Sequence, residues 1–334
     1  YLEVEPLMKE SIRLLNDRIL KPEKSVSSEE IAAVLEDMVQ NSEVVSNKGR
    51  IYQKACFSQE DETARKIAQM LAVSPESLDI GTVLESIRQN LGIALSQRQS
   101  EAVYMAFRSN LSSITGSPGT GKTTTIKGII NIFEYQNLHI ALAAPTGRAA
   151  KRMSEVTGME AKTIHRLLEV EWDEDDRPVF RRNAQNPLDC NALILDELSM
   201  IDIHLFANLL DALPLGCRLI LVGDSDQLPP VGAGNVLQDL IISGMLPVVC
   251  LSQVFRQALE SKIITNAHKI VGGENPDLTN DGKDFFHMER SSPYISAQTV
   301  TELCASRLPS AYGWDSFSDI QVITPSKKGE TGTQ

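Results

Sequence analysis

The segment "GSPGTGKT" constrains the fold of this chain most, because four residues separate Gly116 from Gly121, Lys122 and Thr123. The apolar run "LSSIT" precedes it, and the helix-like segment "KTTTIKGIINIF" begins with its last two residues, Lys122 and Thr123. Glycines let the backbone turn so that N–H groups converge on an anion, and a helix N-terminus adds positive potential. A strand, such a loop and a helix in this order predict a nucleotide-phosphate site in an α/β domain.

The residue types in this loop predict what it holds. Lys122 can reach the β- and γ-phosphates of a nucleoside triphosphate, and the Thr123 hydroxyl suits Mg²⁺. The guanine motif N-K-x-D is absent, because "NKGR" at Asn47 lacks the aspartate and precedes the loop. ATP and Mg²⁺ are therefore the expected cofactors. The predicted phosphate-binding residues are Gly116, Ser117, Pro118, Gly119, Thr120, Gly121, Lys122, Thr123 and Thr124.

A second motif, "ALILDELSMID", predicts acidic groups for the same site. The apolar residues 192–195 form a candidate buried strand that ends at Asp196 and Glu197. Asp196 is predicted to bind Mg²⁺, since a carboxylate is a hard ligand, and Glu197 to polarise the attacking water as general base. The alternative is that both acids only cap the helix after Asp202, but that helix begins too late.

The composition is that of a soluble globular protein, with 42% hydrophobic and 23% charged residues. No apolar run has the roughly 18 residues of a membrane span, and the five scattered cysteines form no C-x-x-C pair. A monomer in a reducing, cytoplasmic setting, without membrane contact, is expected. The net charge of −12 argues mildly against coating nucleic acid by bulk charge but leaves room for a local basic track.

Residues 1–90 are predicted to form a mostly helical first domain. Ser27 and Glu30 have the spacing of a capping box, and "EVVSNKGRIYQ" predicts two short strands around a turn at Asn47-Lys48-Gly49. A helix followed by a two-stranded ribbon resembles a winged-helix unit. Because this stretch is not conspicuously basic, a structural or docking role is favoured over DNA reading.

From Leu111 onward, apolar runs alternate with amphipathic segments, which predicts an α/β domain with a mainly parallel sheet. Ligands of such sheets lie at the carboxyl ends of the strands. Helix starts after the candidate strands, in "APTGRAA" and "TIHRLL", carry small hydroxyls and arginines that suit phosphodiester groups. The candidate strands are "LSSIT", "IALAAP", "ALILDE", "RLILVGD" and "LPVVCLS".

Two further residues have competing interpretations. In "LSQRQSEAV", Ser96 and Gln99 have capping-box spacing, so Gln99 either only caps a helix or also contacts an adenine edge. His165, taken alone, would more simply be a core histidine.

The ordered motifs "LSQRQ", "GSPGTGKT", "APTGRAA", "TIHRLL", "DELSM", "GDSDQLPPVGAG", "VFRQ" and "TPSKKGETGT" resemble the RecD-like helicases, from the 5′-to-3′ branch of superfamily 1. The resemblance covers residues 95–334 and implies an ATP-driven motor that moves 5′ to 3′ on single-stranded DNA, in repair or recombination. It implies adenine contact by Gln99 and an arginine finger, Arg256, whose guanidinium is always charged. The DNA contacts that it implies are Pro145, Thr146, Arg148, Thr163, His165, Thr324 and Pro325.

The resemblance also implies the architecture. It consists of a P-loop RecA-like parallel sheet with helices on both faces (residues 91–250), after the winged-helix-like domain and before an incomplete second RecA-like domain (251–334). An insertion at about 169–190 is predicted to form a β-hairpin, similar to the family's strand-guiding pin, in which Trp172 or Phe180 could stack on a base. A plain surface hairpin is the alternative. The family's later motor motifs should follow Gln334, so a fragment that binds ATP but unwinds poorly alone is expected.

The segment "LVGDSDQLPPVGAG" supplies the candidate coupling residue. Its apolar run is expected to form a strand beside the one that ends at Asp196, which would place Gln227 near the γ-phosphate. A carboxamide can donate and accept, so Gln227 could contact the phosphate or the attacking water, and Pro229-Pro230 would stiffen the chain after it. Two other functions stay open: the helicase part of a conjugative relaxase, and a DNA-binding subunit that binds ATP without cycling. The predicted catalytic set, whose presence argues against the second, is Lys122, Glu197, Gln227 and Arg256.

Overall fold

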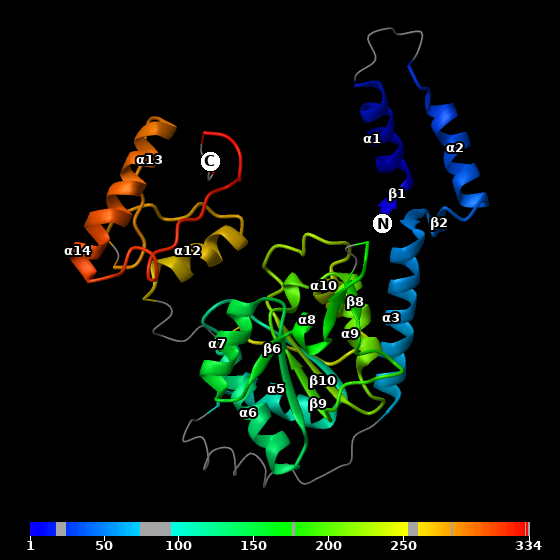
Figure 1. The fold of residues 1–334 in the computed structure, drawn as a ribbon, viewed down its shortest axis with the longest axis horizontal. Helices are drawn as coiled ribbons and strands as arrows, with labels where there is room; N and C mark the ends of the chain where they lie inside the picture. Colours follow the sequence, from blue (N-terminus) through cyan, green and yellow to red (C-terminus); the bar gives the residue numbers. More distant parts are fainter. Residues whose placement is uncertain are drawn as a thin grey trace. The chain divides into compact units, whose positions relative to one another are not determined.

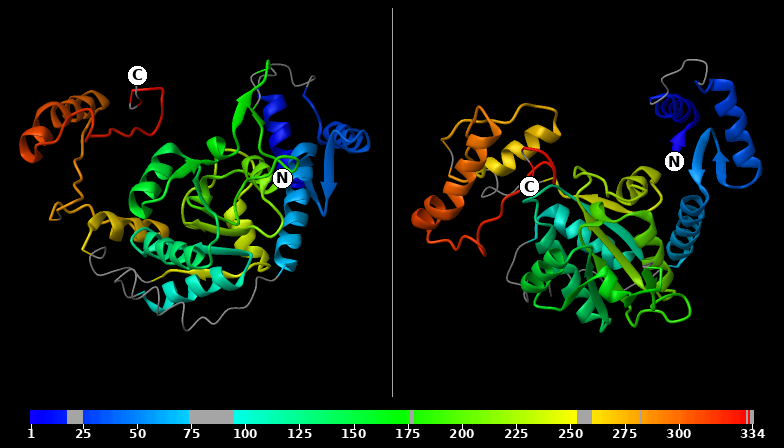
Figure 2. Two further views of the ribbon diagram at one scale, coloured as in Figure 1. Left: turned by 60° about the horizontal axis from the view of Figure 1, so that its bottom comes forward. Right: turned by 45° about the horizontal axis from the view of Figure 1, so that its top comes forward.

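The computed structural model describes residues 1–17, 25–73, 95–175, 178–252, 260–281, 283–330 and 332. The chain divides into two compact units, Tyr1–Ala258 and Leu259–Gln334, and each is described by itself. Figure 1 and Figure 2 show the elements of both units. No helix within the described ranges is long and apolar enough to cross a membrane.

A six-stranded sheet forms the centre of the first unit, and every adjacent pair in it is parallel. The strand order is β11-β4-β10-β9-β5-β6. All five candidate strands from the sequence are confirmed, and β10 lies beside β9 as expected. The strands are β4 (Leu111–Thr115), β5 (Ile140–Ala144), β6 (Ala161–Thr163), β9 (Ala192–Leu195), β10 (Arg218–Gly223) and β11 (Val248–Cys250).

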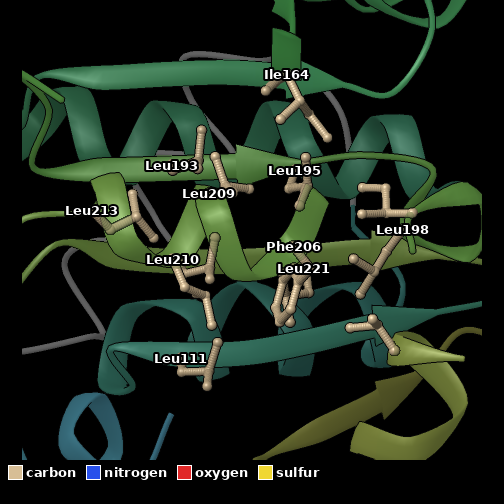
Figure 3. Packing of buried hydrophobic residues seen from close by; sticks show 14 of the residues in the cluster. Leu111, Ile164, Leu193, Leu195, Leu198, Phe206, Leu209, Leu210, Leu213 and Leu221 are labelled. Atoms are coloured by element: carbon tan, nitrogen blue, oxygen red, sulfur yellow. The ribbon is translucent and has the colours of Figure 1, made fainter. Parts of the chain in front are cut away.

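Successive side chains of a strand point to opposite faces of a sheet, so this sheet has side chains to bury on both faces. Helices cover both of them. Leu193 and Leu195 belong to a buried cluster with Phe206 of α9, which Figure 3 shows from close by, whereas Ile194 belongs to a second cluster with Phe133 of α6. The predicted α/β class, a parallel sheet with helices on both faces, is confirmed. The helices of this domain are α5 (Gln97–Arg108), α6 (Lys122–Tyr135), α7 (Gly147–Thr157), α8 (Ile164–Leu167), α9 (Ile203–Ala212) and α10 (Val236–Ser243), with a 3-10 turn, η2 (Leu198–Met200).

The N-terminal part of the first unit contains helices and a small antiparallel sheet of order β1-β3-β2. The predicted capping box at Ser27 and the hairpin around Lys48 and Gly49 are both confirmed. Both turn residues have positive φ, 51° and 76°, as tight two-residue hairpins require. The elements are β1 (Leu2–Glu3), α1 (Val4–Asn16), α2 (Ser28–Gln40), β2 (Val44–Asn47), β3 (Arg50–Gln53) and α3 (Lys54–Ala72).

Helix α3 joins this N-terminal part to the central domain by packing along α9 (Figures 1 and 2). Its buried residues Ile67 and Met70 belong to the same apolar cluster as Phe206. At the surface, Gln59 Nε2 donates to His204 Nδ1 at 2.7 Å. Helix α3 therefore shares a core with the central domain.

The predicted β-hairpin is confirmed as β7 (Val170–Trp172) paired antiparallel with β8 (Pro178–Phe180). Trp172 is exposed, while the Phe180 ring lies 6.3 Å from the rings of both His165 and His204. Phe180 therefore fastens the hairpin to the domain, and Trp172 is the better placed of the two aromatic residues to stack on a base. The role of a strand-guiding pin stays a prediction.

The second unit, in its described part, is helical and contains no strand. Whether it belongs to a second RecA-like domain therefore stays a prediction. Its helices are α12 (Lys262–Val271), α13 (Pro293–Glu302) and α14 (Leu308–Tyr312), with a π-helical turn, η3 (Leu303–Arg307), between the last two.

Candidate functional site

The phosphate loop connects β4 to α6, as the sequence predicts. Gly119 and Gly121 have φ of 80° and 85°, a left-handed conformation that glycine adopts without a steric penalty. The Lys122 ammonium donates to the carbonyl oxygens of Gly116 and Ser117, which holds the side chain across the loop. Lys122 thus lies folded over the site at which it is predicted to meet phosphate.

Gly116 is required for a different reason, which is close packing. A Cβ atom at this position would lie 2.7 Å from Thr120 Oγ1 and 2.8 Å from the Leu251 carbonyl oxygen. Thr120 Oγ1 in turn donates to the Ser117 carbonyl oxygen at 2.7 Å. Any larger residue at position 116 would push the loop away from the sheet.

Asp196 and Glu197 follow β9 at the same edge of the sheet and are partly buried. Burial raises the pKa of both carboxyls, and the neighbouring Asp196 raises the pKa of Glu197 further. Lys122 and Arg152 oppose these shifts by favouring the charged forms. A carboxylate with a raised pKa is a stronger base, which suits the role predicted for Glu197.

The capping alternative for these acids does not fit the structure. Glu197 stands before η2 but makes no side-chain capping hydrogen bond, and α9 begins only at Ile203. The N-cap of α9 is Asp202, whose Oδ1 accepts from the Leu205 N–H at 2.8 Å. Nothing in the local helix geometry therefore uses the Glu197 carboxylate.

The residues present fit the expected Mg²⁺ and ATP. Magnesium commonly takes one or two carboxylates, keeps several waters and binds substrate phosphates, so it needs no cage of protein ligands. One oxygen of Asp196, Oδ1, accepts from the Glu197 N–H at 2.9 Å, and Oδ2 is the oxygen left for a metal. Thr123, in the first turn of α6, would supply the hydroxyl. Bound Mg²⁺ would offset the negative charge of the phosphates.

Gln99 is the N3 residue of a complete capping box at the start of α5. Its Oε1 accepts from the Ser96 N–H at 2.9 Å, and its Nε2 donates to the Gly121 carbonyl oxygen at 3.2 Å. The capping role is therefore confirmed, and the amide also contacts the phosphate loop. Contact with adenine stays a prediction.

Gln227 lies in a segment, residues 224–234, that we call the Gln227 loop. It begins directly after β10, between the phosphate loop and the acidic strand end. The Ser199 hydroxyl donates to Gln227 Oε1 at 3.1 Å. Since Ser199 lies two residues after Glu197, this hydrogen bond joins the coupling candidate to the segment that carries the candidate base.

A second set of hydrogen bonds joins the Gln227 loop to the phosphate loop. The Thr115 hydroxyl donates to Ser225 Oγ at 3.1 Å, and the Ser225 N–H donates to Thr115 Oγ1 at 3.2 Å. The Ser117 hydroxyl donates to Asp226 Oδ2 at 3.3 Å. The sequence interpretation missed Thr115, Ser199, Ser225 and Asp226, because their partners lie far along the chain.

The candidate DNA contacts of the first unit lie at the carboxyl ends of β5 and β6. Thr146 Oγ1 accepts from the Ala149 N–H at 3.2 Å and caps α7, and Thr163 caps α8 in the same way. Each hydroxyl hydrogen can still be donated to a phosphate oxygen. Pro145 lies beside Thr146, and Arg148 and His165 are exposed in the first turns of α7 and α8.

The remaining candidates lie elsewhere. Arg256 falls outside the described residues. Thr324 and Pro325 belong to the second unit, where the Thr324 hydroxyl donates to the Ser326 carbonyl oxygen at 3.0 Å. Their predicted roles stay predictions.

Several known proteins are similar to this chain. The sequence model of an AAA domain family matches residues 99–233, a range that includes Gln99, the phosphate loop, Asp196, Glu197 and Gln227. The ATP-dependent RecD2 DNA helicase of Deinococcus radiodurans is 36% identical over 289 residues, or 86% of this chain. The chain is related to the RecD-like helicases. The resemblance predicted from the motif order is thereby confirmed.

Two further known proteins are similar to parts of this chain. The RecBCD enzyme subunit RecD of Mycolicibacterium smegmatis is 39% identical over 168 residues, covering 43% of this chain. The chain spans 38% of the length of the Deinococcus protein and 30% of that of this RecD subunit. The crystal structure of Pif1 helicase from Candida albicans has a TM-score of 0.44 and 22% identity, over 64% of this chain and 55% of that one.

Proposed function

We propose that the protein containing this chain is an ATP-dependent DNA helicase or translocase. One observation carries the proposal: strands β4, β10 and β9, which end at the nucleotide motifs, are neighbours in the sheet, and β5 and β6, which end at the candidate DNA contacts, come next in the strand order. Because parallel strands end at the same edge, ATP and DNA would bind side by side on one domain. Movement 5′ to 3′ on single-stranded DNA and a role in repair or recombination are inferred from the RecD-like relatives.

The proposed reaction uses residues that follow strands β4 and β9, together with Arg256. Lys122 and the phosphate-loop N–H groups hold the triphosphate, and Thr123 and Asp196 hold Mg²⁺. Glu197 takes a proton from the attacking water. Arg256 is proposed to stabilise the charge that develops on the transferred phosphate.

Gln227 is proposed to couple this reaction to movement. Its carboxamide can contact the γ-phosphate or the attacking water, and it is already tied to Ser199 at 3.1 Å. Loss of the γ-phosphate would change that contact. Since prolines fix φ, the segment Pro229-Pro230 is stiff. A displacement of Gln227 would therefore move the rest of the loop instead of bending the backbone next to Gln227. Gln227→Ala should therefore uncouple ATP turnover from DNA binding more than it weakens ATP binding.

The first test is the ATPase rate of the full-length protein with and without single-stranded DNA. DNA should stimulate hydrolysis, and Lys122→Ala should abolish it. Glu197→Gln should retain nucleotide binding and lose turnover, because an amide is no base. An ATPase rate that does not respond to DNA would refute the motor function. Normal hydrolysis by Glu197→Gln would refute only the assignment of the base.

We further propose that the protein acts as a cytoplasmic monomer with Mg·ATP and single-stranded DNA as its ligands. Sedimentation velocity of the full-length protein, with and without DNA, tests the oligomeric state. A stable dimer that forms without DNA would contradict a monomeric motor. Omission of Mg²⁺ should suppress hydrolysis, while the fold, measured by circular dichroism, should not change.

A further inference from the structure

The N-terminal part of the first unit contains an apolar cavity of about 690 Å³ between α1, α2 and the strands β2 and β3. This volume is within the roughly 300–1,000 Å³ range of ligand-binding pockets. We call it the N-terminal groove. The reactions proposed above use none of the residues that line it.

The two helices α1 and α2 run side by side in opposite directions (Figure 1), and residues of both line the groove. Helix α1 contributes Leu7 and Leu15, and α2 contributes Ile31, Val34 and Leu35. On both helices the lining residues have the spacing of one helical face, and neither helix contains a fully buried residue. Two such ridged faces can accept a third helix between their side chains.

The charges around the groove indicate the chemistry of the occupant. Glu30 and Glu60 line it, and α2 carries four acidic residues and no basic one. Burial raises the pKa of the Glu60 carboxyl and Asp239 raises it further, while the N-terminal ammonium and Arg50 lower it in part. In the part of the chain that the structure describes, no Lys or Arg forms an ion pair with Glu60. A cationic side chain of an occupant would complement these acids.

One wall of the groove belongs to the Gln227 loop, since Ala233 and Gly234 line it. The Ala233 carbonyl oxygen accepts from the Ile203 N–H at 2.9 Å, at the first residue of α9. A Cβ atom on Gly232 would collide with the side chain of Asp202, the N-cap of α9. The far end of the loop therefore contacts the start of α9 and lines the groove, while its near end carries Gln227.

We propose that the N-terminal groove binds an amphipathic helix of a partner protein, with an apolar face and a flanking lysine or arginine, and that its occupancy changes ATP turnover through the Gln227 loop. The binding part stands on the groove alone. The coupling part rests on the proposed function, because it is measured as ATP hydrolysis.

The test uses the full-length protein and a fluorescein-labelled synthetic helix of about 18 residues, roughly 27 Å long, with leucines on one face and lysines along its flank. A peptide of the same composition with scrambled order is the control. The ordered peptide should bind at least about tenfold more tightly than the scrambled one, measured by fluorescence anisotropy. It should also change the DNA-stimulated ATPase rate at least about twofold.

Matched variants locate the binding site. Val34 is exposed and lines the groove, so Val34→Asp should keep the fold yet weaken binding about tenfold or more. Ala33→Asp, at an exposed position next to it that does not line the groove, should bind as the wild type does. Glu60→Gln should weaken binding in a way that high salt reproduces in the wild type.

Several results would overturn the proposal. Equal binding of both peptides, or of Val34→Asp and Ala33→Asp, would exclude the groove as the site. Concentration-dependent dimerisation that Val34→Asp abolishes would assign the groove to a second copy of the chain. Binding without any change in a DNA-stimulated ATPase rate would refute the coupling and leave the proposed function intact. A protein without DNA-stimulated hydrolysis would instead refute the proposed function, while peptide binding would still be tested by anisotropy.

Discussion

The hydrogen bond between Ser199 and Gln227 allows a quantitative test of the coupling role. Ser199→Ala removes the hydroxyl that donates to Gln227 Oε1 at 3.1 Å. A hydrogen bond of this kind contributes a net stabilisation of about 0.5–1.5 kcal/mol. Because Gln227 is exposed, water can replace the lost donor, so no buried unpaired group adds to this cost.

This range converts into an expected rate. At about 1.4 kcal/mol for each factor of ten, the fraction of molecules with Gln227 correctly placed should fall about twofold to tenfold. If hydrolysis requires the placed amide, kcat should fall by the same factor. The KM for ATP should change little, since the phosphate loop is untouched.

The assay is steady-state ATP hydrolysis by the full-length protein with saturating single-stranded DNA. Ser243→Ala is the matched control, because this exposed hydroxyl makes only local hydrogen bonds at the end of α10: it donates to the Leu240 carbonyl oxygen and accepts from the Met245 N–H. An unchanged kcat for Ser199→Ala would show that the hydrogen bond does not place Gln227 for the reaction. An equal loss in the control would point to a general effect on the fold, which the thermal midpoint would reveal.

Three further predictions rest on burial and packing. The pKa of Glu197 is raised, and only the ionised carboxylate can act as the proposed base. As the pH falls, protonation of Glu197 should therefore reduce kcat at a pH above the roughly 4.3 of an ordinary glutamate. A pH–rate profile without this loss of rate on the acidic side would contradict the role. Gly232→Ala should lower the thermal midpoint, because its Cβ atom would collide with the Asp202 carboxylate that caps α9. Gly147→Ala is the control and should not lower it, since a Cβ atom there has open space. Equal midpoints for the two variants would show that the loop moves to accommodate the extra atom. Phe206→Ala should lower the free energy of unfolding, measured in urea, by about 3–5 kcal/mol. Leu215→Ala is the control and should change it very little, because Leu215 is 80% exposed. A small loss for Phe206→Ala would mean that neighbouring side chains move into the space that the ring leaves.

The sequence predicted the central sheet well because its strands are short apolar runs buried on both faces. It missed β6, since Ala161–Thr163 contains a lysine and has no apolar run. The tertiary hydrogen bonds had no local signal. Thr115 and Ser225 are 110 residues apart, and they meet only because β10 pairs with β4, an order that the sequence does not show.

Local sequence patterns, unlike the tertiary hydrogen bonds, could be predicted from the sequence. The capping boxes at Ser27 and Ser96 depend on residues three apart, and both formed as expected. The second contact of Gln99, with the carbonyl of Gly121, joins residues 22 apart and could not be predicted from spacing. The N-terminal groove was also missed, because it depends on how α1 and α2 pack against strands that lie later in the chain.

The backbone at Glu197 has a consequence for engineering this protein. Its φ of 55° is left-handed, which costs a residue with a Cβ atom about 1–2 kcal/mol. A glycine would relieve this strain but would remove the carboxylate. Selection of random variants for heat resistance alone would therefore favour molecules that lack the proposed base. A screen for more stable variants must score the proposed ATP hydrolysis in the same round, since the gain in stability and the loss of the carboxylate come from the same change.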